Sequence, residues 1–171
     1  MTTITETTLL QIPHVIGGRH LDPGARRGTV YNPSRGVATG EVGLADAALV
    51  AEAAAVAAEA QKAWRDVGLV KRAQLMFRVR EIITSRADEL ARIITAEHGK
   101  TVPDARGEVA RGLENVEFCT GLMHHLKGEY SEQIATGLDV HQVRQPLGVV
   151  ACIPPFNFPA MLPLWMVPTA I

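Results

Sequence analysis

The sequence has no excess of charge of either sign. Lys and Arg number 17 against 18 Asp and Glu, and the formal net charge is −1. A protein that binds a nucleic-acid backbone or an anionic membrane through electrostatics needs a surplus of basic residues. The balance of charge therefore argues against both kinds of partner.

Cysteine is also scarce. Only Cys119 and Cys152 occur, and they lie too far apart in the sequence to form a C-x-x-C pair. This pattern fits reduced thiols in a cytoplasmic or matrix enzyme better than the disulfide framework of a secreted protein.

Long uninterrupted hydrophobic runs are missing. The longest apolar stretch, residues 158–171, contains Pro159, Pro163 and Pro168, and it is shorter than the roughly 20 residues that a bilayer span needs. Residues 1–11 are rich in Thr and lack the basic flank and apolar core of a signal peptide. We expect no membrane anchor, and we interpret residues 1–13 as a mobile tail.

Helical patterns occupy the middle of the chain, which is 47% apolar and long enough for a packed core. Apolar residues recur three and four positions apart in four segments. Asp46 can cap the first helix, and Ser85 with Asp88 resembles a capping box for the third. The expected bounds are 46–64 for the first helix, an end near 85 for the second, 85–99 for the third and 103–128 for the fourth.

Extended patterns flank the helices. Gly17 and Gly18 lie between short apolar runs and predict a hairpin turn, and residues 31–42 are expected to be extended chain and turns. Residues 134–145 alternate in polarity, which indicates a half-exposed antiparallel strand. Residues 147–153 are apolar throughout, as in a strand covered on both faces of a parallel sheet. Cys152 should then be a buried core thiol, and the order of elements favours an α/β protein.

The loop after this strand carries the candidate chemistry. Pro154, Pro155 and Pro159 restrict the backbone around Asn157, at the edge where open α/β sheets bind ligands. The Asn157 amide can donate two hydrogen bonds, which suits the stabilisation of an oxyanion. Spacing alone favours the alternative that Asn157 only stabilises a turn.

Neither histidines nor basic residues form a clear binding site. His124 and His125 are adjacent, so on a helix they point about 100° apart and cannot share a metal, and we expect no metal site. The basic residues on the second helix favour a solvated face. They are Lys71, Arg72, Arg78, Arg80 and Arg86.

Residues 155–159, Pro-Phe-Asn-Phe-Pro, resemble the segment that follows the first sheet strand in aldehyde dehydrogenases. Other runs resemble the same family in the same order: 15–19, 31–33 with 40–42, 63–64 and 97–100. Residues 107–118, together with 155–166, are most similar to the CoA-acylating methylmalonate-semialdehyde dehydrogenases. The resemblance covers nearly the whole chain from His14.

The resemblance implies the amino-terminal part of a larger α/β fold. It predicts a hairpin and helices of an NAD-binding domain over 14–130, antiparallel bridging strands over 131–146, and the first strand of a doubly wound parallel sheet, the Asn loop and the start of a helix over 147–171. The family's Lys-Pro-Ser-Glu run and its nucleophilic cysteine are not found. We therefore expect this chain alone neither to oxidise aldehydes nor to bind NAD tightly.

The resemblance also assigns roles to four residues. Asn157 matches the asparagine that, with the backbone N–H of the nucleophilic cysteine, holds the oxyanion. Phe156 and Pro154 match positions that border the nicotinamide half of NAD, although a smaller residue is usual at position 154. Arg111 matches an arginine that pairs with the carboxylate of a semialdehyde, which a guanidinium suits well. Without the resemblance, Arg111 reads as a solvated arginine near Glu108.

The implied activity is NAD-dependent, CoA-acylating oxidation of methylmalonate or malonate semialdehyde to propionyl-CoA or acetyl-CoA with loss of carbon dioxide. The implied cofactor is NAD, the co-substrate is coenzyme A, and the basic second helix could meet CoA phosphates. A homo-oligomer, a tetramer or dimer, is expected. Two alternatives stay open: a dehydrogenase for another semialdehyde or an uncharged aldehyde, and a non-catalytic interaction fragment that pairs through residues 131–146.

Overall fold

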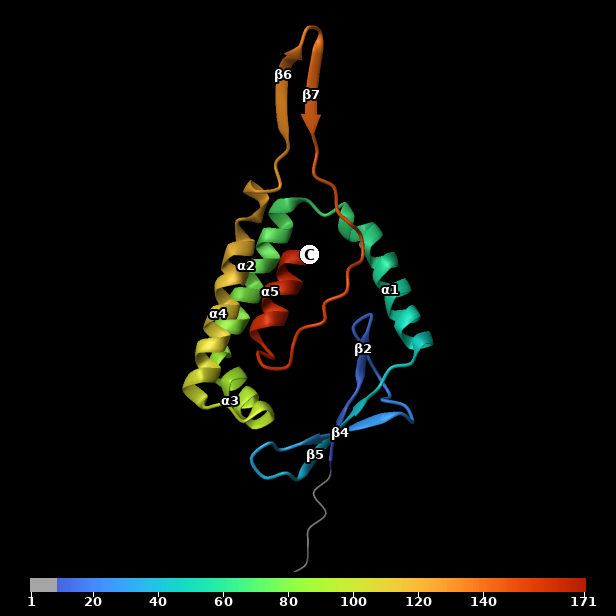
Figure 1. Cartoon of the computed structure of the whole chain (residues 1–171), viewed down its shortest axis with the longest axis vertical. Coiled ribbons are helices and arrows are strands. Elements are labelled where there is room, and N and C mark those ends of the chain that lie inside the picture. Colours follow the sequence, from blue (N-terminus) through green and yellow to red (C-terminus); the bar gives the residue numbers. More distant parts are fainter. Residues whose placement is uncertain (1–8) are drawn as a thin grey trace, which may run out of the picture.

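The computed structural model describes residues 9–171. Short strands come first, four helices follow, and a hairpin and a last helix complete the described chain (Figure 1). The elements in chain order are β1 (Leu10–Ile12), β2 (His14–Ile16), β3 (Arg19–Leu21), β4 (Arg27–Tyr31), β5 (Ala38–Gly43), α1 (Ala47–Arg65), α2 (Leu69–Ser85), α3 (Ala87–His98), α4 (Val102–Thr120), the 3₁₀-helix η1 (Leu122–His124), β6 (Glu129–Ala135), β7 (Leu138–Gln142) and α5 (Met161–Ala170).

The first strands form two small sheets. β2 and β3 pair as the predicted hairpin, with Gly17 at φ 58° and Gly18 at φ 74° in its turn. The region expected as extended chain and turns contains β4 and β5, which pair antiparallel. β1 pairs parallel with β5. The expected tail is therefore wrong for residues 10–12, while residues 1–8 lie outside the described part of the chain.

The helices follow the predicted pattern with three corrections. Asp46 caps α1 by accepting from the Leu49 N–H at 2.8 Å, as expected. Ser85 does not cap the third helix, because its hydroxyl donates to the Ile82 carbonyl at the end of α2. The Thr101 hydroxyl caps α4, which begins one residue before Pro103. α4 ends at Thr120 rather than near residue 128, and η1 follows it.

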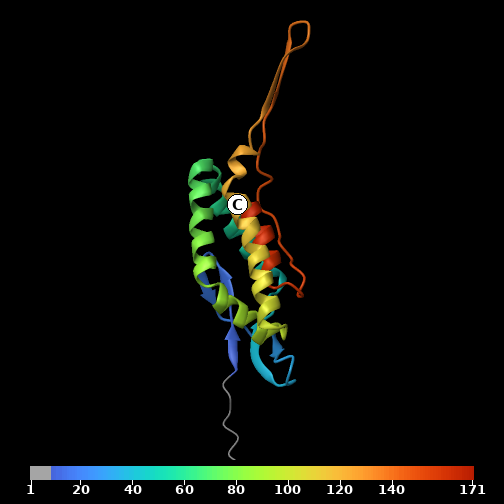
Figure 2. The same ribbon diagram turned by 90° about the vertical axis from the view of Figure 1, so that its left-hand side faces the viewer.

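The core lies where α4 packs against α2, α3 and α5, which Figures 1 and 2 show side by side. Gly112 allows α4 and α5 to approach closely, since a Cβ there would lie 3.2 Å from Met161 Cα. The buried core residues are Ile83, Ala91, Ile94, Ala105, Val109 and Val116. α4 is thus the central element of the packed part of the molecule.

The alternating pattern over 134–145 predicted one strand, whereas the structure has a two-stranded antiparallel hairpin, in keeping with the antiparallel strands that the resemblance implies over 131–146. β6 and β7 pair antiparallel and project from one end of the helices (Figure 1). All residues of both strands are exposed. The alternating apolar residues therefore do not face the core of this chain.

Residues 147–153 do not form the predicted sheet strand. They run as an extended segment, and Leu147 is 96% exposed and Ile153 85% exposed. Their apolar composition favours burial on two faces, but this requires neighbouring strands, and residues 9–171 supply none beside this segment. For the same reason Cys152 is exposed, and its assignment as a core thiol is wrong.

α5 begins shortly after the Asn loop and contains a proline near its end. Pro168 has no N–H, so the carbonyl of Leu164 lacks its usual helical donor. The side-chain amide of Asn115 on α4 donates to that carbonyl at 3.0 Å. The same amide also reaches the Trp165 carbonyl and the Thr169 hydroxyl, both at 3.2 Å. Asn115 therefore joins α4 to the interrupted part of α5.

We predict that Asn115→Leu lowers the free energy of unfolding by about 1–2 kcal/mol, because the partly buried Leu164 carbonyl loses its donor. Urea unfolding of the purified chain measures the change. Glu114→Leu, the same replacement at an exposed neighbouring position on α4, is the control and should change stability little. Equal stabilities for the wild type and Asn115→Leu would contradict this account.

Candidate functional site

The loop of residues 154–159 carries three of the four residues assigned from the sequence. Phe156 is 87% exposed, and Pro154 and Asn157 are exposed as well. Within residues 9–171 the carboxamide of Asn157 makes no hydrogen bond, so it does not stabilise the local turn. Both of its N–H groups can therefore donate to an external acceptor.

The backbone of this loop is held by an ion pair between Lys100, in the turn before α4, and Glu108 on α4. The Nζ of Lys100 donates to the carbonyl of Asn157 at 2.9 Å and to Oε2 of Glu108 at 2.5 Å. The side chain of Lys100 is 12% exposed and that of Glu108 is fully buried. The pair thus lies beneath the loop, and the Glu108 carboxylate has no contact with water.

Glu108 also caps α5 from outside that helix. α5 has no capping side chain of its own, because it begins with Ala160 and Met161. The Oε1 of Glu108 accepts from the N–H groups of Ala160 and Met161 at 2.7 and 3.1 Å. A carboxylate at a helix N-terminus satisfies free N–H groups and interacts favourably with the helix dipole.

These contacts decide the ionisation of Glu108. Burial by itself would raise the pKa of Glu108, but the hydrogen bonds from Lys100 and from the Ala160 and Met161 amides outweigh burial. The pKa of Glu108 is consequently held below its ordinary value of 4.5. The carboxylate is ionised at neutral pH, as a helix cap paired with an ammonium requires.

The ring of Phe158 lies near two cations. The Lys100 Nζ is 4.7 Å and the Arg111 Cζ 5.8 Å from its centroid, distances typical of cation–π contacts. The carbonyl of Arg111 accepts from the Trp165 indole N–H at 3.1 Å. The structure therefore brings Arg111 to the loop, next to the residue that follows Asn157.

Arg111 is exposed, as a solvated arginine would be, and it also lies beside the Asn loop. Its side chain is exposed, but no ion pair among residues 9–171 includes it. Glu108, one of the two acidic residues near it in the sequence, is paired with Lys100 instead. The guanidinium of Arg111 is thus exposed beside Phe158 and able to meet an anionic group from outside the chain.

Sequence reasoning gave no role to Lys100 and Glu108. The signal was available at Glu108, which falls on the buried face of α4 with Ala105, Val109 and Gly112. Glutamate is almost never fully buried unless it is paired. A glutamate at an apolar-face position therefore predicts a buried partner, although nothing in the local pattern points to Lys100.

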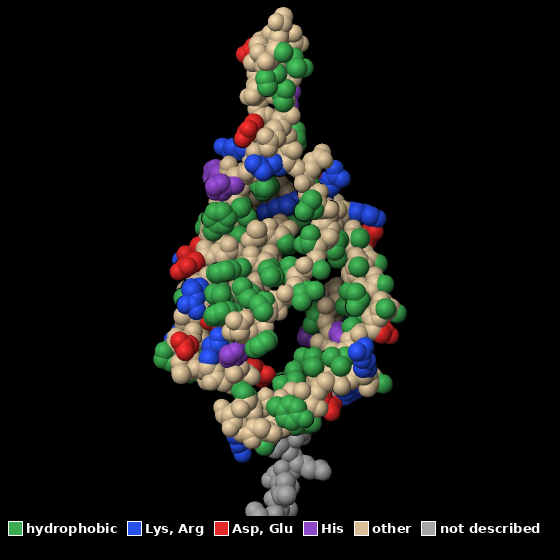
Figure 3. All heavy atoms as spheres, viewed as in Figure 1, with side chains coloured by type: hydrophobic (Ala, Val, Ile, Leu, Met, Phe, Trp, Pro, Cys, Tyr) green, Lys and Arg blue, Asp and Glu red, His purple; other side chains and the backbone are tan. Residues whose placement is uncertain are grey.

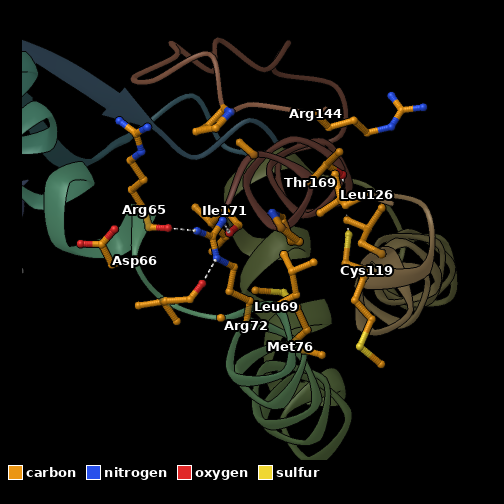
Figure 4. Close-up of a pocket in the computed structure, with 18 of the residues that line it drawn as sticks. Arg65, Asp66, Leu69, Arg72, Met76, Cys119, Leu126, Arg144, Thr169 and Ile171 are labelled. Atoms are coloured by element: carbon orange, nitrogen blue, oxygen red, sulfur yellow. Dashed lines mark hydrogen bonds between the residues drawn. The ribbon is translucent and has the colours of Figure 1, made fainter. Parts of the chain in front are cut away.

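The first of two cavities lies at the end of the helices opposite the loop and has a volume of about 470 Å³ (Figure 4). Arg72 lines it, and its guanidinium donates to the Trp64 carbonyl at 2.8 Å and the Val67 carbonyl at 3.0 Å. Arg144 points away from Arg72. Arg72 thus binds backbone carbonyls at the end of α1 and just after it. The sequence predicted a purely solvated basic face, and this prediction is wrong for Arg72.

The second cavity, of about 630 Å³, is bounded by α1, α5 and residues 148–152. Hydrophobic side chains gather on this face of the molecule (Figure 3). Residues such as Trp64, Val150 and Val167 line it. Neither of these cavities includes residues 154–157 or Arg111, which are exposed in the described part of the chain.

Two classes of site are not found in the described part of the chain. Residues 9–171 contain no cluster of three or more His, Cys, Asp or Glu side chains arranged to hold a metal ion. None of the described helices is long and apolar enough to cross a membrane.

Comparison with known families places this geometry in context. The model described as "Aldehyde dehydrogenase family" matches residues 21–171. The fold is a mixed α/β arrangement that matches the amino-terminal third of that family's fold. The chain belongs to the aldehyde dehydrogenase family.

Its similar relatives include semialdehyde dehydrogenases. The malonate-semialdehyde dehydrogenase of Pseudomonas aeruginosa is 44% identical over 92% of this chain and 32% of its own length. Malonate-semialdehyde dehydrogenase 2 of Oceanobacillus iheyensis is 40% identical over 98% of this chain and 35% of its own length. The chain spans about a third of the length of the curated relatives that it matches.

Solved structures agree. A putative methylmalonate-semialdehyde dehydrogenase from Sinorhizobium meliloti, complexed with NAD, has a TM-score of 0.89 and 36% identity, covering 94% of this chain and 33% of its own. The methylmalonate-semialdehyde dehydrogenase of Oceanimonas doudoroffii has the same TM-score and 43% identity, with the same coverage of both chains. The predicted resemblance to this group is confirmed as similarity of sequence and structure.

The lowered pKa of Glu108 predicts how stability depends on pH. The stabilisation is complete above the ordinary pKa of 4.5 and is lost as the pH falls through the lower pKa of the folded chain. Glu108→Gln should lower the free energy of unfolding by about 3 kcal/mol at pH 7, because it breaks a buried pair. The difference between the wild type and this variant should then shrink on acidification.

Urea unfolding of the chain at a series of pH values measures this difference. Asp88→Asn is the matched control, because Asp88 is exposed and pairs with Arg106, which lies on α4 with Glu108. Exposed pairs contribute little to stability, so the control should follow the wild-type curve. A wild-type advantage over Glu108→Gln that persists unchanged at low pH would contradict the assignment.

Proposed function

We propose that the protein carrying this chain is an NAD-dependent semialdehyde dehydrogenase, and that residues 154–159 with Arg111 form its share of the active site. The observation that supports this most directly is the unbonded carboxamide of Asn157, exposed on a loop whose backbone is fixed by Lys100. Similarity to malonate- and methylmalonate-semialdehyde dehydrogenases supports the choice of substrate class.

Asn157 is proposed to stabilise negative charge on the aldehyde oxygen during attack by a nucleophile outside this chain. A preorganised amide donor contributes most when it is aimed at an oxygen that gains charge in the transition state. The Asn157 N–H groups are available as donors, because they are exposed and make no bond within residues 9–171. The tie from Lys100 to the carbonyl of the same residue limits movement of the loop.

The same loop is proposed to border NAD. Pro154 and Phe156 offer an exposed apolar surface with few free donors, which fits the edge of a nicotinamide ring better than a phosphate group. NAD, when bound, accepts a hydride from the substrate. Two similar solved structures hold NAD, the Sinorhizobium protein and one called PnpE.

Arg111 is proposed to bind the carboxylate of the semialdehyde. Its guanidinium has no anionic partner among residues 9–171 and lies near the ring of Phe158. An arginine that stacks on an aromatic ring keeps a fixed direction and can make two parallel bonds to a carboxylate. We further propose a malonate- or methylmalonate-derived semialdehyde as substrate, with coenzyme A accepting the acyl group and carbon dioxide lost.

The experiment compares methylmalonate semialdehyde with propanal in the full-length protein. Asn157→Ala should lower kcat about 10²-fold to 10³-fold for both substrates, because the oxyanion loses a donor. Arg111→Ala should lower kcat/KM about 10-fold to 100-fold for the acid substrate only, because it removes charge-assisted bonds. NADH formation measures both effects.

Arg106→Ala is the control for Arg111→Ala, since Arg106 is an exposed arginine on the same helix that pairs with Asp88. It should leave both substrates unaffected. Equal losses for the two substrates in Arg111→Ala would favour an uncharged aldehyde. Full activity in Asn157→Ala would refute the proposed site.

We also propose that β6 and β7 form an assembly surface of a homo-oligomer. Ile134, Leu138 and Val140 are 61%, 52% and 42% exposed on this projecting hairpin. Exposed apolar strands with free edges are templates for pairing with another chain.

Val140→Lys should therefore reduce the mass of the full-length protein, measured by light scattering, to that of a smaller assembly. Thr136→Lys, in the turn of the same hairpin, is the control and should leave the mass unchanged. A wild-type protein that is already a monomer would contradict the proposal.

A further inference from the structure

One ion pair binds the backbone of both the Asn loop and the start of α5. Lys100 donates to the Asn157 carbonyl, and its partner Glu108 accepts from the amides of Ala160 and Met161. The pair therefore contacts the backbone on both sides of residues 158 and 159. No side chain of the loop itself makes these bonds.

We infer that Lys100 and Glu108 are positioning residues that fix the direction of the Asn157 carboxamide by holding the backbone at both ends of the short segment 157–161. This inference rests on the proposed role of Asn157. It assigns a function to a buried ion pair that contacts the backbone of the loop and not the carboxamide of Asn157.

Three features favour positioning over simple stabilisation. Apart from its prolines, the part of the loop before Asn157 has few restraints, since Phe156 is 87% exposed and the extended segment before it is unpaired. The Lys100 Nζ also lies 4.7 Å from the ring of Phe158, so the residue next to Asn157 is restrained by the same ammonium. Finally, Glu108 is fully buried on the central helix, which gives the pair a rigid base.

The size of the expected effect follows from geometry. A displacement of about 1 Å in a group that contacts the reacting atoms can cost about 10²-fold in rate. Release of the Asn157 carbonyl permits the loop backbone to rotate and redirects the amide. Lys100→Met keeps an unbranched side chain of similar length and removes the ammonium.

The test is a double-mutant cycle on kcat in the full-length protein, using Lys100→Met and Asn157→Ala. Lys100→Met alone should lower kcat about 10-fold to 100-fold with KM changed by no more than about twofold. In the Asn157→Ala background the same change should have almost no further effect, because the group that it positions is gone. Arg106→Met, which breaks an exposed pair on the same helix, should keep wild-type kcat in both backgrounds.

A purely structural role predicts that Lys100→Met lowers kcat by the same factor in both backgrounds. That result would overturn the inference. Wild-type kcat in Lys100→Met would overturn it as well. If Asn157→Ala itself keeps full activity, the proposed function fails, and that outcome is distinct from the others. Glu108→Gln is a second variant that retains a carbonyl acceptor for α5 and should show the same coupling to Asn157.

Hydrogen exchange provides a readout that does not depend on turnover. In Lys100→Met and in Glu108→Gln, the amides of Ala160 and Met161 should exchange at least about tenfold faster than in the wild type, because the restraint at the start of α5 is weakened. The amides within α3 serve as the internal reference. Unchanged exchange at Ala160 and Met161 in both variants would also overturn the inference.

Discussion

The arrangement of the candidate site depends on one buried ion pair. Glu108 can lie with no exposed surface only because Lys100 and two backbone amides compensate for its lost hydration. Once these partners are in place, the start of α5 and the carbonyl of Asn157 are fixed relative to α4. The exposed amide of Asn157 and the guanidinium of Arg111 are then presented from a common base.

Patterns within single elements predicted much of the fold. Asp46 and the spacing of apolar residues located α1, and Gly99 located the end of α3, because capping and amphipathicity are local properties. The Ser85 capping box failed because the hydroxyl found a nearer acceptor in the preceding helix. β1 was missed because three residues are too few to show a period, and its pairing with β5 joins segments far apart in the chain.

The sequence pointed to some residues of the candidate site and missed others. Asn157, Phe156, Pro154 and Arg111 came from resemblance to a family, and their roles remain proposals. Lys100 and Glu108 carry the geometry, but their contacts join α4 to residues more than fifty positions away. Residues 147–153 show the reverse case. Their composition indicates burial on two faces, yet that burial depends on strands that residues 9–171 do not place beside them.

The separation of Lys100 and Glu108 by eight positions spans the turn at Gly99 and the first turns of α4. Each residue added to a helix rotates everything after it by about 100°. One inserted residue between Thr101 and Glu108 would therefore carry the carboxylate away from α5 while leaving the apolar composition of α4 unchanged. Chain length between Thr101 and Glu108 is consequently constrained by the contacts of Glu108, whereas the turn at residues 136–137 is exposed and can change in length without moving any packed element among residues 9–171.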